Sequence, residues 1–254
     1  MLYPEDLTIE NVLSEWRHWG TKWKKSPEII RAFSSGLTNR SYLIRVNGAF
    51  YKLRINSPKS AQLGVNRERE QGILQGLAHL GFTPQLLYSS PTYSYSLFEY
   101  IEGEPWTKAS TLSATSQQKI TDLIRRYQQV QFKTTDSTSA DLYTRNYIKY
   151  FNEYEKQLKP SALTDEEWER FFDFKESLQR WQNQQRTAVL CHHDLLPENI
   201  IEQENRLYIL DWEYAAVGCG DLDFLSIGCR KQVKDAFSQA LFFWLNTLWF
   251  KLQQ

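Results

Sequence analysis

The chain has 254 residues, enough to bury a sizeable core in one large domain or in two lobes. It carries 30 basic and 30 acidic residues, so no global field draws it to nucleic acid or to an anionic membrane. The N-terminus lacks the basic region and apolar run of a signal peptide, and the three cysteines are an odd number without metal-site spacing. A cytoplasmic protein with free thiols is the simplest interpretation.

The first hundred residues predict a short leading helix and then a sheet with one inserted helix. Apolar residues recur at helical spacing between residues 7 and 19. Asn47 and Gly48 form a two-residue hairpin signal, so the strands on either side of them should be antiparallel. A further helix is expected over residues 60–80. Short runs rich in β-branched and aromatic residues predict five strands, at residues 29–33, 42–46, 50–55, 86–88 and 96–101.

The turn after the first strand, residues 34–41, consists mainly of small and hydroxyl-bearing residues. Gly36, Thr38 and Asn39 let the backbone come close to a ligand and offer N–H donors to phosphate oxygens. A plain hairpin turn explains the same composition. The turn alone therefore leaves both a structural and a phosphate-binding role open.

The third strand and the helix after it carry charges on faces that should be buried. Lys52 and Arg54 alternate with apolar residues, so both point to one face of the sheet. Glu70 lies on the apolar stripe of the helix, three and four residues before Ile73 and Leu74. Burying a carboxylate without a partner is costly. We therefore expect Glu70 to pair with a cation of the third strand, the alternative being a rim residue that reaches solvent.

Residues 102–105, Glu-Gly-Glu-Pro, are a cluster of chain breakers and mark the best domain boundary. They predict an N-terminal lobe of residues 1–101 and a C-terminal lobe of residues 102–254. The apolar run in the last helix is too short to span a membrane. The second lobe is expected to be mainly helical, with helices over 113–132, 142–158, from 164 onward and over 233–252.

The helix over residues 142–158 carries tyrosine and phenylalanine along one broad side. Such a side can hold a quaternary ammonium group through cation–π contacts. Packing against a neighbouring helix is the simpler explanation, since apolar stripes at helical spacing usually face a core. The same choice arises for Trp244 in the last helix, which is either a core residue or a wall of an acceptor pocket.

The most informative stretch lies around two short predicted strands, residues 188–191 and 207–210. His192-x-Asp194 is followed by Asn199, and Asp211 comes directly after the second strand. Phosphoryl transfer from ATP needs this set, because one carboxylate orients the attacking hydroxyl and takes its proton while other oxygens bind Mg²⁺. The spacing follows the catalytic loop and the metal-binding aspartate of protein kinases.

Residues 192–200 and 210–215 together resemble the motifs of the aminoglycoside phosphotransferase and choline kinase superfamily. The Asp-Trp-Glu-Tyr-Ala form of the second motif is similar to the choline/ethanolamine and thiamine kinase branch. The resemblance spans about residues 34–224. It implies an α+β, bilobal, protein-kinase-like fold, with a five-stranded antiparallel sheet plus one helix in the N-lobe, a mainly helical C-lobe and ATP between them.

The resemblance also implies roles for individual residues. Asp194 would be the catalytic residue, Asn199 and Asp211 would hold Mg²⁺, and Asp223 would anchor the catalytic loop. The family pattern Val-Leu-Arg favours Arg54 over Lys52 as the cation for the ATP phosphates, and so as the expected partner of Glu70. The residues that would contact ATP come from the turn, the third strand, its helix and the hinge: Gly36, Thr38, Asn39, Arg54, Glu70, Glu99, Tyr100 and Ile101.

The resemblance implies a kinase that phosphorylates the hydroxyl of a small cationic alcohol, choline or thiamine, with ethanolamine close behind. Glu213, Tyr214 and Trp244 are the residues expected to contact this acceptor. An aminoglycoside phosphotransferase is the alternative enzyme, since Glu153, Glu155 and the acids of residues 165–169 offer an acidic wall. The acids of residues 165–167 also have a structural explanation, because carboxylates in the first turn of a helix interact favourably with the helix dipole. A catalytically inactive pseudokinase is the hypothesis from a different class.

Overall fold

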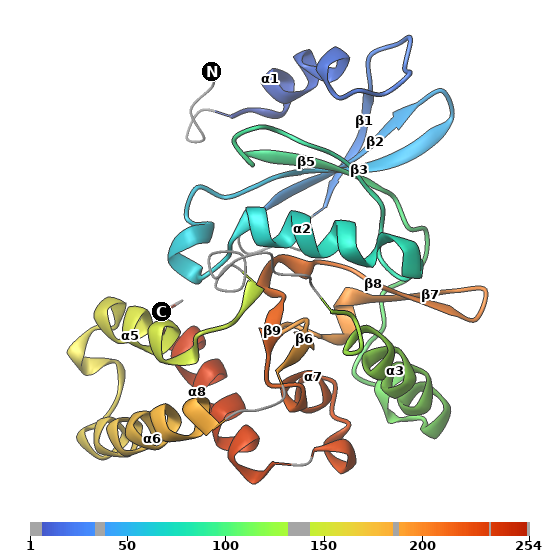
Figure 1. Cartoon of the computed structure of the whole chain (residues 1–254). Coiled ribbons are helices and arrows are strands. Elements are labelled where there is room, and N and C mark those ends of the chain that lie inside the picture. The colour runs from blue at the N-terminus through green and yellow to red at the C-terminus, as the bar shows by residue number, and fades with distance from the viewer. Residues whose placement is uncertain (1–6, 34–38, 132–142, 185–187, 234, 253–254) are drawn as a thin grey trace. The chain divides into compact units, whose positions relative to one another are not determined.

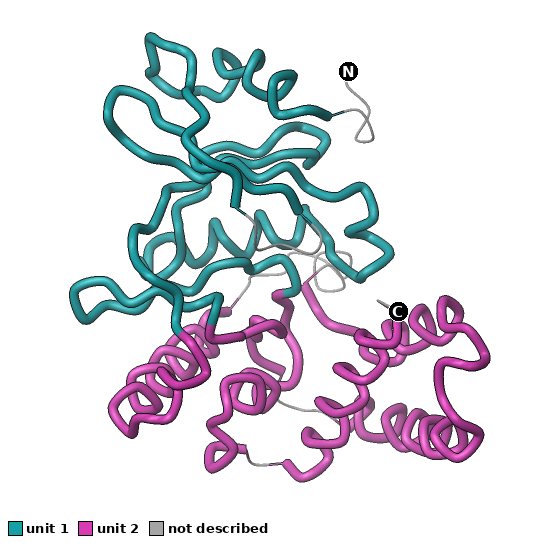
Figure 2. The backbone as a smooth tube through the Cα atoms, turned by 180° about the vertical axis from the view of Figure 1, so that it is seen from behind, with its two compact units in different colours: residues 1–106, 198–214 teal, residues 107–197, 215–254 magenta. Residues whose placement is uncertain are grey.

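The computed structural model describes residues 7–33, 39–131, 143–184, 188–233 and 235–252 (Figure 1). The chain divides into two compact units, coloured separately in Figure 2. Unit 1 consists of residues 1–106 and 198–214, and unit 2 of residues 107–197 and 215–254. These units differ from the predicted lobes in one main respect, because the segment 198–214 belongs with the N-terminal part.

Unit 1 contains the predicted five-stranded antiparallel sheet, in the order β1-β2-β3-β5-β4. The α+β class expected from the sequence is confirmed by this sheet and the helices of unit 2. Asn47 and Gly48 join β2 to β3 with φ angles of 53° and 84°, the left-handed pair that a tight two-residue hairpin needs. The strands are β1 (Glu28–Phe33), β2 (Arg40–Val46), β3 (Ala49–Ile55), β4 (Leu86–Ser89) and β5 (Tyr95–Glu99).

The two faces of this sheet serve different purposes because side chains alternate along β3. Leu53 and Ile55 point into an apolar cluster that includes Trp19 and residues of α1 (Ile9–Ser14). Arg54 points to the other face, where it meets Glu70 of α2 (Arg67–Leu77). One face therefore supplies the core of the unit and the other presents charge.

The helix predicted over residues 60–80 is shorter than expected. Residues 60–63 form one 3₁₀ turn, which ends at Gly64 with φ 80°. The α-helix starts afresh at Arg67, where the Asn66 side chain accepts a hydrogen bond from the Arg69 N–H and caps the helix. A left-handed glycine followed by a capping asparagine ends one helical segment and begins another, a signal that apolar spacing alone does not contain.

The hairpin of β7 (Ile200–Gln203) and β8 (Arg206–Ile209) completes unit 1. Backbone hydrogen bonds fix it there: Ile209 N donates to Phe82 O at 2.8 Å, and Trp106 N donates to Ile200 O at 2.8 Å. This docking carries Asn199 and Asp211, at the two ends of the hairpin, into unit 1.

Unit 2 is mainly helical, as predicted, and contains one short antiparallel pair, β6 (Val189–Cys191) with β9 (Ala216–Gly218). Its apolar core is formed chiefly by α5, α6 and α8, with Phe151, Phe171 and Leu241 fully enclosed. The helices are α3 (Ala114–Tyr127), α5 (Tyr147–Gln157), α6 (Asp165–Gln184), α7 (Asp221–Ser226) and α8 (Ala236–Leu252).

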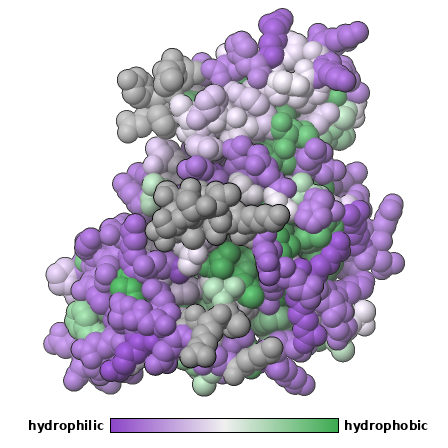
Figure 3. Space-filling model, viewed as in Figure 1, coloured by the Kyte–Doolittle hydropathy of each residue, from purple (hydrophilic) through white to green (hydrophobic). Residues whose placement is uncertain are grey.

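Hydrophilic side chains cover most of the face drawn in Figure 3. None of the helices in the described ranges combines the length and apolar character that crossing a membrane requires.

Candidate functional site

A cavity of about 640 Å³ lies in unit 1, and all of its lining residues belong to that unit. Its volume is in the range of pockets that hold small molecules. Several residues predicted to bind ATP or Mg²⁺ line it, on β3, α2, the segment after β5 and the ends of the β7–β8 hairpin: Arg54, Glu70, Glu99, Tyr100, Ile101, Asn199 and Asp211.

Arg54 is the centre of the charged wall of this cavity. Its Nη2 lies 2.8 Å from Glu70 Oε2 and its Nη1 lies 3.3 Å from Asp211 Oδ1, so the ion pair predicted with Glu70 is present. Burial opposes both charges, but the Glu70 and Asp211 carboxylates raise the pKa of Arg54. Burial likewise opposes ionisation of Glu70, yet Arg54 and Arg67 lower its pKa to about 2. Both side chains are therefore charged over the whole neutral range.

Arg67, the first residue of α2, was not recognised from the sequence. Its guanidinium donates to Glu70 Oε2, to Glu213 Oε2 and to Asn39 Oδ1, at 2.8, 2.8 and 2.9 Å. Asn39 Nδ2 in turn donates to Glu213 Oε2 at 2.8 Å. A basic residue in the first turn of a helix opposes the helix dipole, and that mismatch was the available signal.

Glu213 thus has a different environment from the one expected. It is 5% exposed, and Arg67 and Asn39 both bind its carboxylate inside unit 1. Burial, and next the Asp211 carboxylate, raise the pKa of Glu213. This geometry does not support a direct contact between Glu213 and the cationic end of an acceptor. Glu213 instead joins Asn39, just before β2 begins, to the segment that follows β8.

Asn199 supplies a carboxamide and Asp211 a carboxylate to the same cavity. A backbone hydrogen bond joins the two ends of the hairpin that bear them, with Leu210 N donating to Asn199 O at 2.8 Å. Hard oxygen donors of this kind suit Mg²⁺, which needs one or two protein ligands beside phosphate and water. Asp211 has a φ of 58°, an uncommon conformation for a residue other than glycine and one that clusters at functional sites. Among the described residues, no three His, Cys, Asp or Glu side chains gather into a closed metal cage.

The loop that contains Asp194 belongs to unit 2, where Asp223 holds its start. The Asp223 carboxylate accepts hydrogen bonds from His192 N at 2.8 Å, from His193 N at 2.9 Å and from the Tyr127 hydroxyl at 2.7 Å. Burial raises the pKa of Asp223, whereas His192 and these donors oppose the rise. Asp223 is therefore placed to anchor the loop, as the sequence suggested.

The loop is also shaped from within. His193 adopts a φ of 64°, and its Nε2 lies 2.9 Å from the Tyr147 hydroxyl. Asp194 N donates to His192 Nδ1 at 3.3 Å, and Leu196 N donates to Asp194 O at 2.9 Å. His192 thus supports the loop as an acceptor for the Asp194 N–H.

We predict that Asp223→Asn lowers kcat by roughly tenfold or more and leaves the affinity for ADP unchanged. The amide keeps one acceptor oxygen but places an N–H₂ group against buried backbone donors, which costs about 1–3 kcal/mol for each unsatisfied donor. Tyr127→Phe removes only one of the three bonds and should have a smaller effect. Steady-state kinetics beside ADP titration checks both variants, and an unchanged kcat in Asp223→Asn contradicts the anchoring role.

The remaining acceptor residues fall in different surroundings. Trp244 is 7% exposed and lies in the core of unit 2, with its ring centroid 5.4 Å from that of Phe171. The structure therefore favours the core alternative for Trp244 over a pocket wall. Tyr214 is buried in unit 1. Tyr150 on α5 already has a cation on its ring, because the Arg145 guanidinium carbon lies 4.2 Å from the ring centroid.

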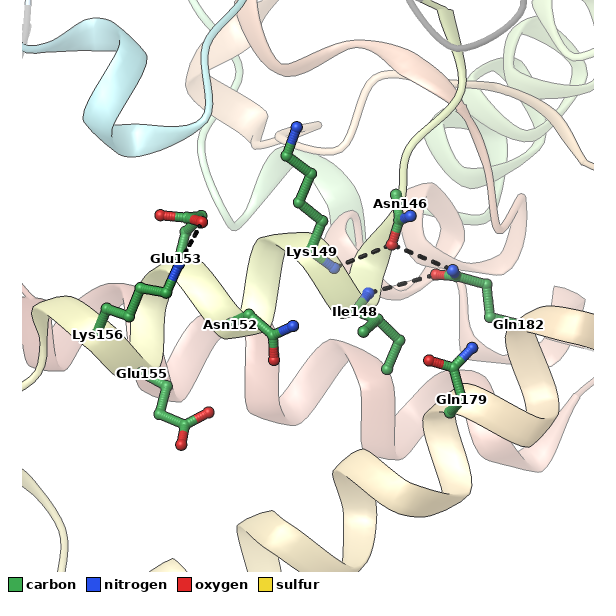
Figure 4. Close-up of a pocket in the computed structure, with 9 residues that line it drawn as sticks. All are labelled: Asn146, Ile148, Lys149, Asn152, Glu153, Glu155, Lys156, Gln179 and Gln182. Carbon is green, nitrogen blue, oxygen red and sulfur yellow. Dashed lines mark hydrogen bonds and ion pairs between the residues drawn. The ribbon is translucent and has the colours of Figure 1, made fainter.

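A second, open groove runs between α5 and α6 in unit 2 (Figure 4). Glu153 and Glu155 line it, but each is paired with a lysine: Glu153 with Lys156 at 3.0 Å, and Glu155 with Lys175. Thr164 N donates to Glu167, and Thr164 Oγ1 accepts from Glu167 N, so helix capping accounts for that acid. These acids do not form the unpaired wall that a polycationic sugar would require.

Two residues of the predicted phosphate loop, Gly36 and Thr38, lie outside the described residues. Asn39, at the end of that loop, also accepts a hydrogen bond from Ser57 N at 3.1 Å, in addition to its bonds with Arg67 and Glu213.

Residues 30–226 match the sequence model of a family described as choline/ethanolamine kinase. The chain is 25% identical over 200 residues to the protein LicA of Haemophilus influenzae, and the alignment covers 77% of this chain and 57% of LicA. It therefore spans little more than half the length of that relative.

The crystal structure of choline kinase LicA from Streptococcus pneumoniae superposes with a TM-score of 0.71 and 18% identity, over 97% of this chain and 91% of that one. A ternary complex of streptomycin, ATP and APH(2″)-IIa gives a TM-score of 0.63 and 22% identity, over 100% of this chain and 84% of that one. At these identities the likeness shows the fold, and it confirms the kinase-like architecture expected from the motifs.

Proposed function

Because the chain belongs to the choline/ethanolamine kinase family, we propose that it is an ATP-dependent kinase for the hydroxyl of a small cationic alcohol. The observation that carries the proposal is Arg54, held between Glu70 and Asp211 on the wall of a cavity in unit 1. Phosphoryl transfer requires such fixed charge beside the phosphates, since most of its catalysis is positioning and electrostatic stabilisation.

In this proposal ATP occupies the cavity of unit 1, with its base beside Glu99, Tyr100 and Ile101. Asn199 and Asp211 hold Mg²⁺, which neutralises charge on the phosphate oxygens when it is bound. Arg67 fixes Asn39 at the end of the phosphate loop and Glu213 after the metal-binding Asp211. Glu213 is then a positioning residue and not a contact for the acceptor.

Asp194 orients the acceptor hydroxyl and receives its proton. The new bond forms between the hydroxyl oxygen and the γ-phosphorus, the bond from that phosphorus to the β–γ bridging oxygen breaks, and ADP leaves with the electron pair. Asp223 keeps the loop of Asp194 in place through the His192 and His193 N–H groups.

Choline and ethanolamine are the first acceptors to test, because the family is described by them. Thiamine belongs in the same test as another small cationic alcohol. An aminoglycoside is the weaker alternative: the acids of the groove in unit 2 are paired with lysines. The cytoplasm is the proposed compartment, since all three cysteines are free and buried, and this suits a reducing environment.

The test is ADP release from Mg²⁺-ATP with choline, ethanolamine, thiamine and streptomycin supplied one at a time. We expect turnover with choline or ethanolamine and none with streptomycin. Turnover with streptomycin alone would replace the proposed acceptor class. No turnover with any acceptor, together with intact ATP binding, would contradict the kinase activity and support a nucleotide-binding pseudokinase.

A further inference from the structure

The hydroxyl of Tyr147, the first residue of α5, joins three segments of unit 2. It accepts a hydrogen bond from Cys219 N at 2.8 Å, in the turn between β9 and α7. It also lies 2.9 Å from His193 Nε2, in the loop that contains Asp194. The Tyr147 side chain is 2% exposed, so both contacts are shielded from solvent. One buried hydroxyl therefore connects the start of α5 to the loop of Asp194.

The space for this hydroxyl exists because residue 218 is a glycine. A Cβ on Gly218 would collide with the Tyr147 hydroxyl oxygen and would lie 3.1 Å from His193 Nε2. Gly218 pairs with Val189 at the start of β6, so the strand ladder fixes its place. Glycine permits this close approach of side chains to the backbone. Any larger residue at position 218 would push the hydroxyl and the imidazole away.

The pattern of donors and acceptors fixes where the protons of this cluster lie. Burial raises the pKa of the Tyr147 hydroxyl well above its ordinary value, so the hydroxyl keeps its proton over the neutral range. The Cys219 N–H can only donate, so the hydroxyl must give its own proton elsewhere. In the described ranges His193 Nε2 is the acceptor within reach of that proton, and a protonated Nε2 would leave it unsatisfied. His193 is therefore held in the tautomer that carries its ring proton on Nδ1.

The backbone of His193 needs such a restraint. Its φ of 64° lies in the left-handed region, which costs free energy for a histidine and is open to glycine. Asp223 accepts a hydrogen bond from the His193 N–H, and the Tyr147 hydroxyl holds the imidazole of the same residue. The next residue in the chain is Asp194, so the conformation of His193 sets the direction in which Asp194 leaves the turn.

We propose that Tyr147 is a positioning residue for phosphoryl transfer, because its hydroxyl holds the His193 side chain and thereby the left-handed turn that directs Asp194 toward the acceptor. In this role Tyr147 acts through His193 and does not touch the reacting atoms. The inference rests on the proposed function, since it needs Asp194 as the group that takes the proton of the acceptor hydroxyl. It adds α5 to the elements that support this loop, beside the backbone bonds to Asp223 on α7.

The test compares Tyr147→Phe, His193→Gly and the double variant with the wild type, by steady-state kinetics with choline or ethanolamine as the acceptor. Tyr147→Phe removes one oxygen, and kcat should fall roughly tenfold, which corresponds to about 1.4 kcal/mol. The affinity for ADP should stay unchanged, because the cavity is lined by unit 1. Glycine adopts a left-handed φ without strain, so in the His193→Gly background the same removal should change kcat by less than about twofold.

Tyr208→Phe is the matched control, because in the described ranges the Tyr208 hydroxyl makes no hydrogen bond and its residue does not line the cavity. Its kcat should equal that of the wild type. An equal fold-loss from Tyr147→Phe in both backgrounds overturns the proposal, since the hydroxyl would then act through Cys219 or the fold at large. An unchanged kcat in Tyr147→Phe overturns it too, and both results leave the proposed function standing. Absence of turnover by the wild type overturns the proposed function and this inference with it.

A measurement on the wild-type protein is independent of turnover. Nitrogen NMR of the chain with isotope-labelled histidine distinguishes a bare ring nitrogen from a protonated one at mildly alkaline pH. The chain has four histidines, and the signals that are missing from His193→Gly identify those of His193. We expect a bare Nε2 and a protonated Nδ1 in the wild type, and a loss of this preference in Tyr147→Phe. A protonated Nε2 in the wild type overturns the proposed tie between Tyr147 and His193.

Discussion

Asp194→Ala should lower kcat by roughly 10²–10⁴-fold, the usual contribution of a positioned general base. The acceptor hydroxyl would lose both the group that orients it and the group that takes its proton. Nucleotide affinity should remain within about twofold of wild type, because every residue that lines the cavity belongs to unit 1 and Asp194 belongs to unit 2. Single-turnover kinetics and ADP titration measure the two effects separately.

Two further variants make this result specific. Asp194→Asn keeps the size and a hydrogen-bond acceptor but cannot take a proton, so its kcat should fall nearly as far. Asp173→Ala removes an exposed acid of α6 and should leave kcat unchanged. Full activity in Asp194→Ala would falsify the proposed kinase mechanism. A parallel loss of ADP binding would show that the substitution disturbs more than the loop.

Glu70→Gln should destabilise the fold by about 3–5 kcal/mol, the cost of removing one partner from a buried ion pair. Both Arg54 and Arg67 bind Glu70 Oε2 at 2.8 Å, and the Glu70 side chain is 4% exposed. A neutral amide leaves two guanidinium groups near each other without the charge between them. Urea unfolding measures the loss, and Glu68→Gln on the exposed side of α2 is the control, which should change little.

The same pair predicts how this loss varies with pH. The folded pKa of Glu70, about 2, lies below its ordinary value of 4.5, so its contribution is complete above about pH 4.5 and disappears as the pH falls toward 2. The difference in unfolding free energy between wild type and Glu70→Gln should therefore shrink between pH 5 and pH 2.5. A difference that stays constant over this interval contradicts the charge as its cause.

Much of the candidate site follows from local patterns. Alternation along β3 put Lys52 and Arg54 on one face, and an acid on an apolar helix stripe required a cation, so the pair of Arg54 and Glu70 was predictable. The antiparallel pairing of β2 with β3 was predictable from the Asn47-Gly48 turn, whereas the pairing of β3 with β5 was not, because α2 and β4 separate these two strands in the chain. The contact of Arg54 with Asp211 was not predictable from local patterns, because the two residues lie 157 positions apart in the chain.

Other features depend on contacts that no local pattern reports. Glu213 lies two residues after Asp211, but a 3₁₀ turn over Trp212–Tyr214 carries it into the network of Arg67. Trp244 has the helical spacing of both a core residue and a pocket wall, and only the packing of Phe171 decides between them. In each case the deciding partner is remote in sequence.

The membership of residues 198–214 in unit 1 has a consequence for how the protein is made. Arg54 emerges early from the ribosome, but Asp211 and the β7–β8 hairpin follow only after most of the chain has been synthesised. Until then the nascent N-terminal segment lacks the hairpin's backbone bonds to Phe82 and Trp106, and it lacks the contact between Arg54 and Asp211. Long-range closure of this kind is slow and leaves surface open to association. The N-terminal hundred residues are therefore expected to need the completed polypeptide, or a chaperone, before they reach a protease-resistant state.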